Sequence, residues 1–297
     1  MSESVLTSVW ASVMVFSDMD GTLLDHHSYD YSAAQAALDR LAALNIPLIL
    51  NTSKTRPEVL AWQKRLGLHT AFIVENGAAA YLPKTLISAD ELAEYSAANK
   101  GIAIADAEDF WQVAMSAPRA QIIDACHALR ERGNYQFEGF SDFSVAQLCD
   151  ITGLAPIDAE QAMAREFSEP ICWQDTDARW QEFETEIAKR GLHALKGGRF
   201  THIMGATDKG VAMLKLAALL CPEQSTITIA LGDSHNDVAM LKAASYAVVI
   251  RSPSHPPPAV SDPQGEVMLS EEFGPAGWSS CMQYLLDKLE SDSNIQN

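Results

Sequence analysis

Short apolar runs alternate with helical patterns along the N-terminal part of the chain. The run Val13–Phe16 is continuously apolar and stops at Ser17, which is typical of a buried strand. From Tyr31 to Leu44 the apolar positions recur at helical spacing. The pattern then repeats as a strand at 46–50, a helix at 57–66 and a strand at 71–74. Alternating strands and helices indicate a parallel sheet with right-handed crossovers, so the sequence predicts an α/β fold.

The pattern changes near residue 84 and returns after Gly205. Between these points, helical stretches at 89–100 and 119–132 alternate with irregular segments that are rich in turn signals. The simple alternation then resumes with helices at 209–220 and 237–244 and strands at 226–231 and 246–250. We therefore predict a discontinuous core formed by residues 1–83 and 206–297, with a second domain inserted at 84–205.

Three polar clusters follow predicted strands. Asp18 and Asp20 come directly after the first strand, and Gly21 permits a tight turn there. Thr52-Ser53 follows the second strand, and Gly232–Asp237 follows a later one and opens a helix. Open parallel sheets bind their ligands outside the carboxyl ends of the strands. We therefore expect these clusters to contribute to a binding site.

The chemistry of these clusters favours a metal and a phosphate. Asp18, Asp20, Asp233 and Asp237 would form a dense set of oxygen ligands, which Mg²⁺ prefers, and such close carboxylates repel one another without a cation. Lys209 opens a helix and adds a positive charge. The set predicts a carboxylate that attacks phosphorus while Mg²⁺ and Lys209 stabilise the phosphoryl oxygens. Taken alone, the Asp18–Thr22 cluster could also be a plain turn, Gly232–Asp237 a helix cap and Lys209 a solvated surface lysine, but their joint occurrence in this order favours the site.

Composition narrows the possible partners. The chain has 297 residues and a net charge of −18, from 21 basic and 39 acidic residues. A nucleic-acid binder needs clustered basic residues, so neither nucleic acid nor an anionic membrane is an expected partner. The apolar runs are too short to span a bilayer, and the N-terminus lacks the basic region of a secretory signal. We expect a cytoplasmic protein.

The cysteines do not indicate a disulfide framework or a zinc site. There are five of them, an odd number, and none forms a C-x-x-C pair. We expect buried free thiols.

The ordered clusters resemble the four motifs of the haloacid dehalogenase superfamily. Asp18-x-Asp20-Gly-Thr resembles the first motif, Thr52 the second, Lys209 the third, and Gly232-Asp233-x-x-Asn236-Asp237 the fourth. The resemblance implies a Rossmann-like doubly wound parallel sheet. It also implies that the insertion at 84–205 is an α+β cap of the superfamily's C2 type.

The resemblance also implies a role for each motif residue. Asp18 would be the nucleophile that forms an aspartyl-phosphate, and Asp20 would protonate the leaving oxygen and then activate water. Thr52 and Lys209 would bind the phosphoryl group. Asp18, the backbone carbonyl of Asp20 and Asp233 would hold Mg²⁺, Asp237 would ligate or orient it, and Asn236 would orient the site. Asp20 also implies that the aspartyl-phosphate is turned over, as in a phosphatase or a mutase. The superfamily's transporting ATPases have threonine at this position and stabilise the phosphoenzyme.

A narrower resemblance is to the mannosyl-3-phosphoglycerate phosphatase family. It rests on four stretches: Asn51–Arg56, Val74–Gly77, Arg165–Pro170 and Gly197–His202. It implies that Arg199 binds a substrate carboxylate through its planar fork and that Glu169 accepts sugar hydroxyls. Ser53 is a substrate-binding candidate because the Thr52-Ser53 pair is suited to holding an anion. For Glu169 and Arg199 an ion pair within the cap is an equal alternative. His235 has no second histidine at metal-ligand spacing and is not assigned to the site.

Together these observations predict a Mg²⁺-dependent phosphatase that acts on a small phosphorylated sugar, with mannosyl-3-phosphoglycerate as the expected substrate. The alternatives are a broader sugar-phosphate phosphatase, a phosphosugar mutase, and a phospho-accepting signalling module with a similar acidic pocket. The large insertion and Asp20 disfavour the signalling module. The oligomeric state stays open.

Overall fold

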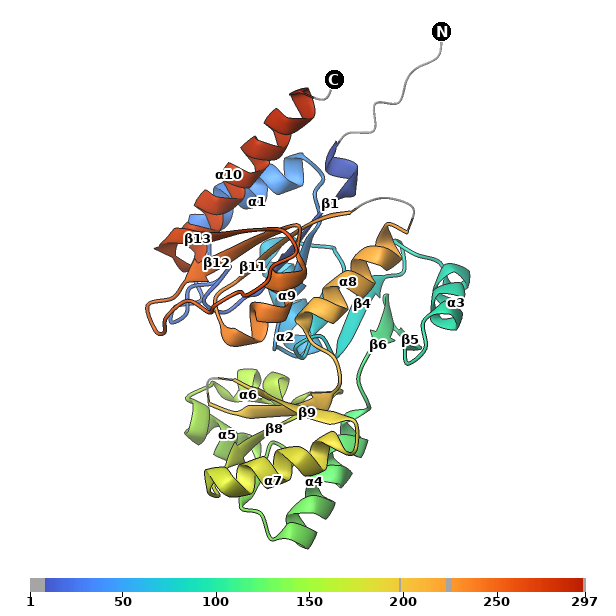
Figure 1. Cartoon of the computed structure of the whole chain (residues 1–297), viewed down its shortest axis with the longest axis vertical. Coiled ribbons are helices and arrows are strands. Elements are labelled where there is room, and N and C mark those ends of the chain that lie inside the picture. The colour runs from blue at the N-terminus through green and yellow to red at the C-terminus, as the bar shows by residue number, and fades with distance from the viewer. Residues whose placement is uncertain (1–8, 198, 223–225, 296–297) are drawn as a thin grey trace. The chain divides into compact units, whose positions relative to one another are not determined.

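The computed structural model in Figure 1 describes residues 9–197, 199–222 and 226–295. The chain divides into two compact units, one made of the segment up to Asn51 together with the chain from Met213 onward, and the other of Thr52–Ala212. Gly198, which belongs to one of the stretches that carry the narrower resemblance, lies outside the described residues.

The first unit contains a parallel sheet with the strand order β13-β12-β11-β1-β2. The chain runs from β1 to β2 on one side and returns later to β11 on the other side of β1, so the order reverses between β1 and β11. This is the doubly wound topology that the family resemblance implies, and sheets of this type generally bind their ligands at such a reversal. The strands are β1 (Val13–Ser17), β2 (Leu48–Asn51), β11 (Ile227–Gly232), β12 (Tyr246–Arg251) and β13 (Glu266–Phe273).

Helices pack on this sheet and bury its central strands. Helix α10 (Gly274–Ile295) contacts α1 (Gln35–Ala43) and strands β12 and β13, and Figure 1 shows α10 in red beside α1. Helix α9 (Val238–Ala243) packs against β11 and β12. Every residue of β1 is buried, which explains why its sequence is continuously apolar rather than alternating.

The second unit contains two antiparallel arrangements of strands. One has the order β3-β4-β6-β5, formed by β3 (Phe72–Val74), β4 (Ala79–Pro83), β6 (Phe110–Ala114) and β5 (Ala103–Ala107). Helices α2 (Arg56–Leu66) and α3 (Ala89–Ala98) belong to this part. The sequence predicts β3 and both helices, but not the hairpin of β5 and β6.

The other sheet has the order β7-β8-β10-β9 and a separate core. Its strands are β7 (Phe137–Gly139), β8 (Ser168–Trp173), β10 (Thr201–Gly205) and β9 (Leu192–Lys196). Helices α4 (Arg119–Gly133) and α7 (Asp177–Ala188) cover it, and Phe183, Ile122 and Ile203 share one buried cluster. Helices α5 (Val145–Thr152) and α6 (Pro156–Met163) pack around a second cluster at Phe140 and Leu148. Helix α8 (Lys209–Leu220) follows β10.

All five cysteines are free, as expected, but only Cys126 and Cys281 are buried and the other three are half-buried. Across the described residues, no helix is long and apolar enough to cross a bilayer.

The indole of Trp278 on α10 links the helix to the end of β1. Trp278 is fully buried, and its Nε1 donates a hydrogen bond of 2.9 Å to Ser17 Oγ, which in turn donates one of 2.6 Å to the backbone oxygen of Asp18. We expect Trp278→Phe to lower the free energy of unfolding by about 1–3 kcal/mol, because it removes a buried hydrogen bond and leaves a small void. Urea unfolding measures this loss.

Tyr284→Phe on the same helix is the control. Tyr284 is exposed, so its substitution should change the free energy of unfolding by less than about 0.5 kcal/mol. Equal effects of the two substitutions would contradict the role given to the buried indole.

Candidate active site

Three aspartates gather at the carboxyl ends of β1 and β11. Asp18, Asp233 and Asp237 are all buried, and one carboxylate oxygen from each lies within 4.8 Å of the others. Asp18 directly follows β1, and its backbone N–H donates to the oxygen of Leu231 in β11 at 2.9 Å. The topological reversal of the sheet therefore brings the residues of the first and fourth motifs together.

A tight turn after β1 fits against Asp233. The turn closes through hydrogen bonds from Gly21 N to Leu24 O, at 2.8 Å, and from Leu24 N to Met19 O, also at 2.8 Å. Gly21 has a φ of +77°, and a Cβ at this position would lie 2.6 Å from Asp233 Oδ2. Only glycine allows both this backbone conformation and this approach of the turn to the carboxylate. Asp20 lies in the same turn and is half-buried.

Asp237 is held by the backbone that follows β11. Its Oδ2 accepts hydrogen bonds from Asp233 N at 3.1 Å and from Ser234 N at 3.0 Å, within a short 3-10 turn at His235–Asp237. Asn236 accepts a short hydrogen bond from Ser234 Oγ through Oδ1. His235 is exposed, consistent with leaving it out of the site.

The pKa of the Asp233 carboxyl group is strongly raised. Burial, followed by the neighbouring charges of Asp18 and Asp237, raises its pKa from 3.8 to about 7. Thr22 Oγ1 donates to Asp233 Oδ1 at 3.0 Å, and His255 Nε2 lies 3.2 Å from Asp233 Oδ2. Three buried carboxylates at this separation repel one another, so a divalent cation fits the charge and the oxygen donors of the cluster.

The hydroxyl and ammonium groups of the second and third motifs lie in the Thr52–Ala212 unit. Thr52 N donates to Ile73 O at 3.1 Å, and Thr52 Oγ1 accepts from Lys54 N at 3.2 Å. Thr52 O accepts from Asn76 N at 2.9 Å, so Thr52 lies against the turn that joins β3 and β4.

The same turn packs against the start of α8, where Lys209 is fully buried. Gly77, with a φ of +93°, lies so close that a Cβ would be 2.2 Å from Asp208 O and 2.9 Å from Lys209 N. Thr207 Oγ1 also donates to Gly77 O at 3.0 Å. The β3–β4 turn thus contacts both Thr52 and the segment that carries Lys209, which are far apart in the sequence.

A buried carboxylate on this turn anchors a segment before β8. Glu75 accepts hydrogen bonds from the backbone N–H groups of Glu166, at 2.8 Å, and Phe167, at 3.2 Å. Arg165 Nε lies 3.6 Å from the Glu75 carboxylate, and Arg165 Nη2 donates to Ser53 O at 2.7 Å. Three of the stretches that carry the narrower resemblance, Asn51–Arg56, Val74–Gly77 and Arg165–Pro170, are therefore joined by direct contacts. The role of Glu75 in holding this segment could not be predicted from the sequence, because its partners are about ninety residues away along the chain.

The two predicted cap residues already make contacts within the protein. Glu169 is buried and accepts hydrogen bonds from Arg119 Nε at 2.8 Å and from Ser141 N at 2.7 Å. Arg199 is exposed, and its Nη1 donates to Ile151 O at 2.5 Å. Glu169 therefore forms an ion pair with Arg119, which is the alternative to a role in substrate binding. Arg199 is accessible to solvent.

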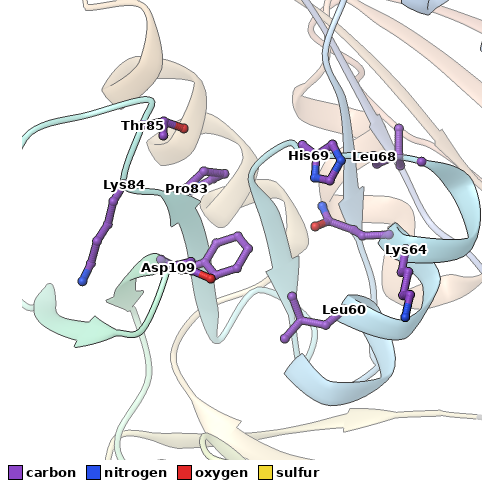
Figure 2. Close-up of a pocket in the computed structure, with 11 residues that line it drawn as sticks. Leu60, Lys64, Leu68, His69, Pro83, Lys84, Thr85 and Asp109 are labelled. Carbon is purple, nitrogen blue, oxygen red and sulfur yellow. The ribbon is translucent and has the colours of Figure 1, made fainter.

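A pocket of about 660 Å³ lies elsewhere in the same unit (Figure 2). Its lining combines α2 and the segment after it with the end of β4 and the start of β6, and includes Leu60, Lys64, His69, Lys84 and Phe110. Lys84 is paired with Asp106 at 2.7 Å. The residues assigned to the chemistry by sequence do not line this pocket, so it is not the predicted site.

The chain is similar to a known protein family and to a characterised phosphatase. A family model described as haloacid dehalogenase-like hydrolase matches residues 15–256. The glucosyl-3-phosphoglycerate/mannosyl-3-phosphoglycerate phosphatase of Methanococcoides burtonii is 33% identical over 279 residues, which are 93% of this chain and 97% of that protein.

Two solved structures illustrate the shared fold. A phosphatase of the haloalkanoate enzyme superfamily from Bacteroides thetaiotaomicron is 17% identical, with a TM-score of 0.62 over 97% of this chain and 98% of that one. The sucrose-phosphatase of Synechocystis, solved with sucrose and phosphate, is 13% identical, with a TM-score of 0.53 over 92% of this chain and 97% of that one. At these identities the similarity supports the fold alone.

The close approach of Gly21 to Asp233 can be tested against a matched glycine. Gly67 also has a positive φ, +64°, but a Cβ there would meet nothing within 4 Å. Each glycine-to-alanine substitution should lose about 1 kcal/mol of stability through the left-handed backbone. We expect Gly21→Ala to lose more and also to weaken Mg²⁺ binding, because its methyl group displaces Asp233. Urea unfolding and calorimetric titration with Mg²⁺ measure both effects, and equal behaviour of the two variants would contradict the proposed packing.

The raised pKa of Asp233 predicts that metal-free stability falls with rising pH. Folded Asp233 keeps its proton up to a pKa of about 7, whereas the unfolded chain releases it near the ordinary value of 3.8. Between these values the folded state binds more protons, so this group makes the free energy of unfolding decrease as pH rises, with no further change above the folded pKa. Urea unfolding in EDTA from pH 5 to pH 8.5 should show a smaller decrease for Asp233→Asn. Parallel profiles for the two proteins would exclude Asp233 as the cause.

Proposed function

The chain belongs to the haloacid dehalogenase-like hydrolases, and we propose that it is a Mg²⁺-dependent phosphatase that acts on a small sugar derivative through an aspartyl-phosphate intermediate. It is a phosphoric monoester hydrolase, as its family and its phosphatase relative indicate. The observation that carries the proposal is the buried cluster of Asp18, Asp233 and Asp237 at the carboxyl ends of β1 and β11.

The donor set supports Mg²⁺ as the cofactor. Three buried carboxylates supply the hard oxygen ligands that Mg²⁺ requires. Burial and their mutual repulsion, which raise the pKa of Asp233, make a cation favourable. Asp18, Asp233 and Asp237 would hold the ion, with Asp20 contributing from the adjacent turn and Asn236 orienting the cluster. When bound, the ion would neutralise charge on the phosphoryl oxygens.

Asp18 is the proposed nucleophile. Its carboxylate oxygen bonds to the phosphorus of the substrate while the bond to the leaving oxygen breaks, and Asp20 gives its proton to that oxygen. Asp20 then takes a proton from a water molecule, which attacks the phosphorus of the acyl phosphate. This second step releases inorganic phosphate and returns Asp18 to the free carboxylate.

Thr52, Ser53 and Lys209 are proposed to bind the phosphoryl group. The support for these roles is their place in the second and third motifs, together with the contacts of the β3–β4 turn with Thr52 and with the start of α8. Buried Lys209 would supply a fixed positive charge to the equatorial phosphoryl oxygens.

The proposed substrate is mannosyl-3-phosphoglycerate, with the glucosyl compound as its nearest competitor. The support is the relative from Methanococcoides burtonii, whose name includes both compounds. Arg199 is accessible and is proposed to bind the carboxylate of the glycerate group. Glu169 stays the proposed acceptor of sugar hydroxyls, although its contacts with Arg119 and Ser141 must rearrange or be shared for it to do so.

The test is Mg²⁺-dependent phosphate release from both phosphoglycerate compounds and from common hexose and triose phosphates. We expect kcat/KM for the mannosyl or glucosyl compound to exceed the others at least ~100-fold, about 2.7 kcal/mol of transition-state stabilisation. Asp18→Asn is the blank and should release no phosphate above background. Retention of more than a few per cent of the wild-type rate would remove Asp18 as the nucleophile, and a flat substrate profile would remove the proposed substrate but not the phosphatase chemistry.

A further inference from the structure

Both oxygens of the Asp233 carboxylate have a side-chain partner outside the acidic cluster. Oδ1 accepts from Thr22 Oγ1 at 3.0 Å, and Oδ2 lies 3.2 Å from His255 Nε2. The Asp233 side chain is only 3% exposed, so its contact with His255 is shielded from water on the carboxylate side. Burial, and after it repulsion from Asp18 and Asp237, raises the pKa of Asp233, and the same repulsion favours rotation of its carboxylate. Thr22 and His255 oppose that rotation.

His255 is itself held in a defined orientation. Its other ring nitrogen, Nδ1, lies 3.2 Å from the backbone oxygen of Pro256. A carbonyl oxygen can only accept, so a hydrogen bond here requires the proton on Nδ1, and Nε2 is then directed at Asp233. A carboxylate that binds a cation is ionised and can only accept, so the hydrogen bond that holds Asp233 in that state is donated by Nε2.

The backbone around His255 is restricted. The segment from Ser252 to Pro263 contains five prolines, three of which directly follow His255. Each proline fixes its own φ and limits the residue before it. His255 therefore approaches Asp233 from a loop that loses little conformational freedom when the contact forms.

We propose that His255 is a positioning residue that holds the Asp233 carboxylate in the orientation needed to bind the divalent cation. The inference rests on the proposed function for the identity of the cation, but it concerns binding rather than turnover. Partners of this kind around a metal ligand restrict its rotation, and their loss commonly weakens metal binding 10–100-fold. His235 is closer to Asp233 in the sequence, but it is exposed and offers a matched control.

The test is calorimetric titration of the full chain with Mg²⁺, and with Mn²⁺ as a second probe, at one fixed pH. We expect His255→Ala to weaken binding at least about 10-fold, and His255→Gln to recover most of this loss because its amide can still donate to Asp233. His235→Ala should bind as the wild type does. Thermal unfolding without metal identifies any variant that fails to fold, and the Gln variant then carries the comparison.

Several outcomes would overturn the proposal: wild-type affinity in a folded His255→Ala variant, no recovery in His255→Gln, an equal loss in His235→Ala, or no binding of either ion by the wild type. Phosphate release from the same preparations separates this inference from the proposed function. Wild-type protein that binds Mg²⁺ in a His255-dependent manner but hydrolyses no phosphate monoester would leave the positioning role in place and remove the phosphatase.

Discussion

The repulsion among three buried carboxylates is the constraint on which the proposed chemistry depends. Asp18, Asp233 and Asp237 each offer an oxygen within 4.8 Å of the others, and burial adds to the cost of ionising them. A cluster of this kind persists only because the surrounding fold fixes it. The parallel pairing of β1 with β11 sets the backbone, and Trp278 holds the end of β1 through Ser17. The same repulsion that costs stability in the metal-free protein would make the proposed binding of a cation favourable.

In the second unit, one turn joins distant parts of the chain. Its β3–β4 turn is left-handed at Glu75, Asn76 and Gly77, and it uses that shape to contact Thr52, the start of α8 and the segment before β8. Glu75 is almost fully buried and is satisfied by backbone N–H groups and by Arg165. One buried carboxylate thus links stretches that are about ninety residues apart. Removal of only one partner would lower the stability of the fold, because it would leave the other charge buried and unpaired.

Much of the fold could be predicted from the chain, but the site only in part. The continuous apolar run of β1 and the helical spacing after it predict buried parallel strands, and β1, β2 and β11 confirm this. Strand β13 was not predicted, because it is largely exposed and acidic and lacks the apolar run of its neighbours. The clustering of Asp18 with Asp233 follows from strand ends that share one edge of a sheet. His255 could not be predicted, because a lone histidine among prolines carries no spacing signal and only its tertiary contact with Asp233 reveals it.

The most direct measurement is to trap the intermediate on Asp18. Wild-type protein turning over mannosyl-3-phosphoglycerate with Mg²⁺ would be quenched in acid and treated with borohydride, which reduces an acyl phosphate to a primary alcohol, and then mapped by mass spectrometry. Nucleophilic catalysis by Asp18 predicts modification at that residue alone, dependent on substrate and absent in Asp18→Asn. Continued phosphate release with Asp18 unmodified, or modification of another carboxylate that persists in Asp18→Asn, would contradict it.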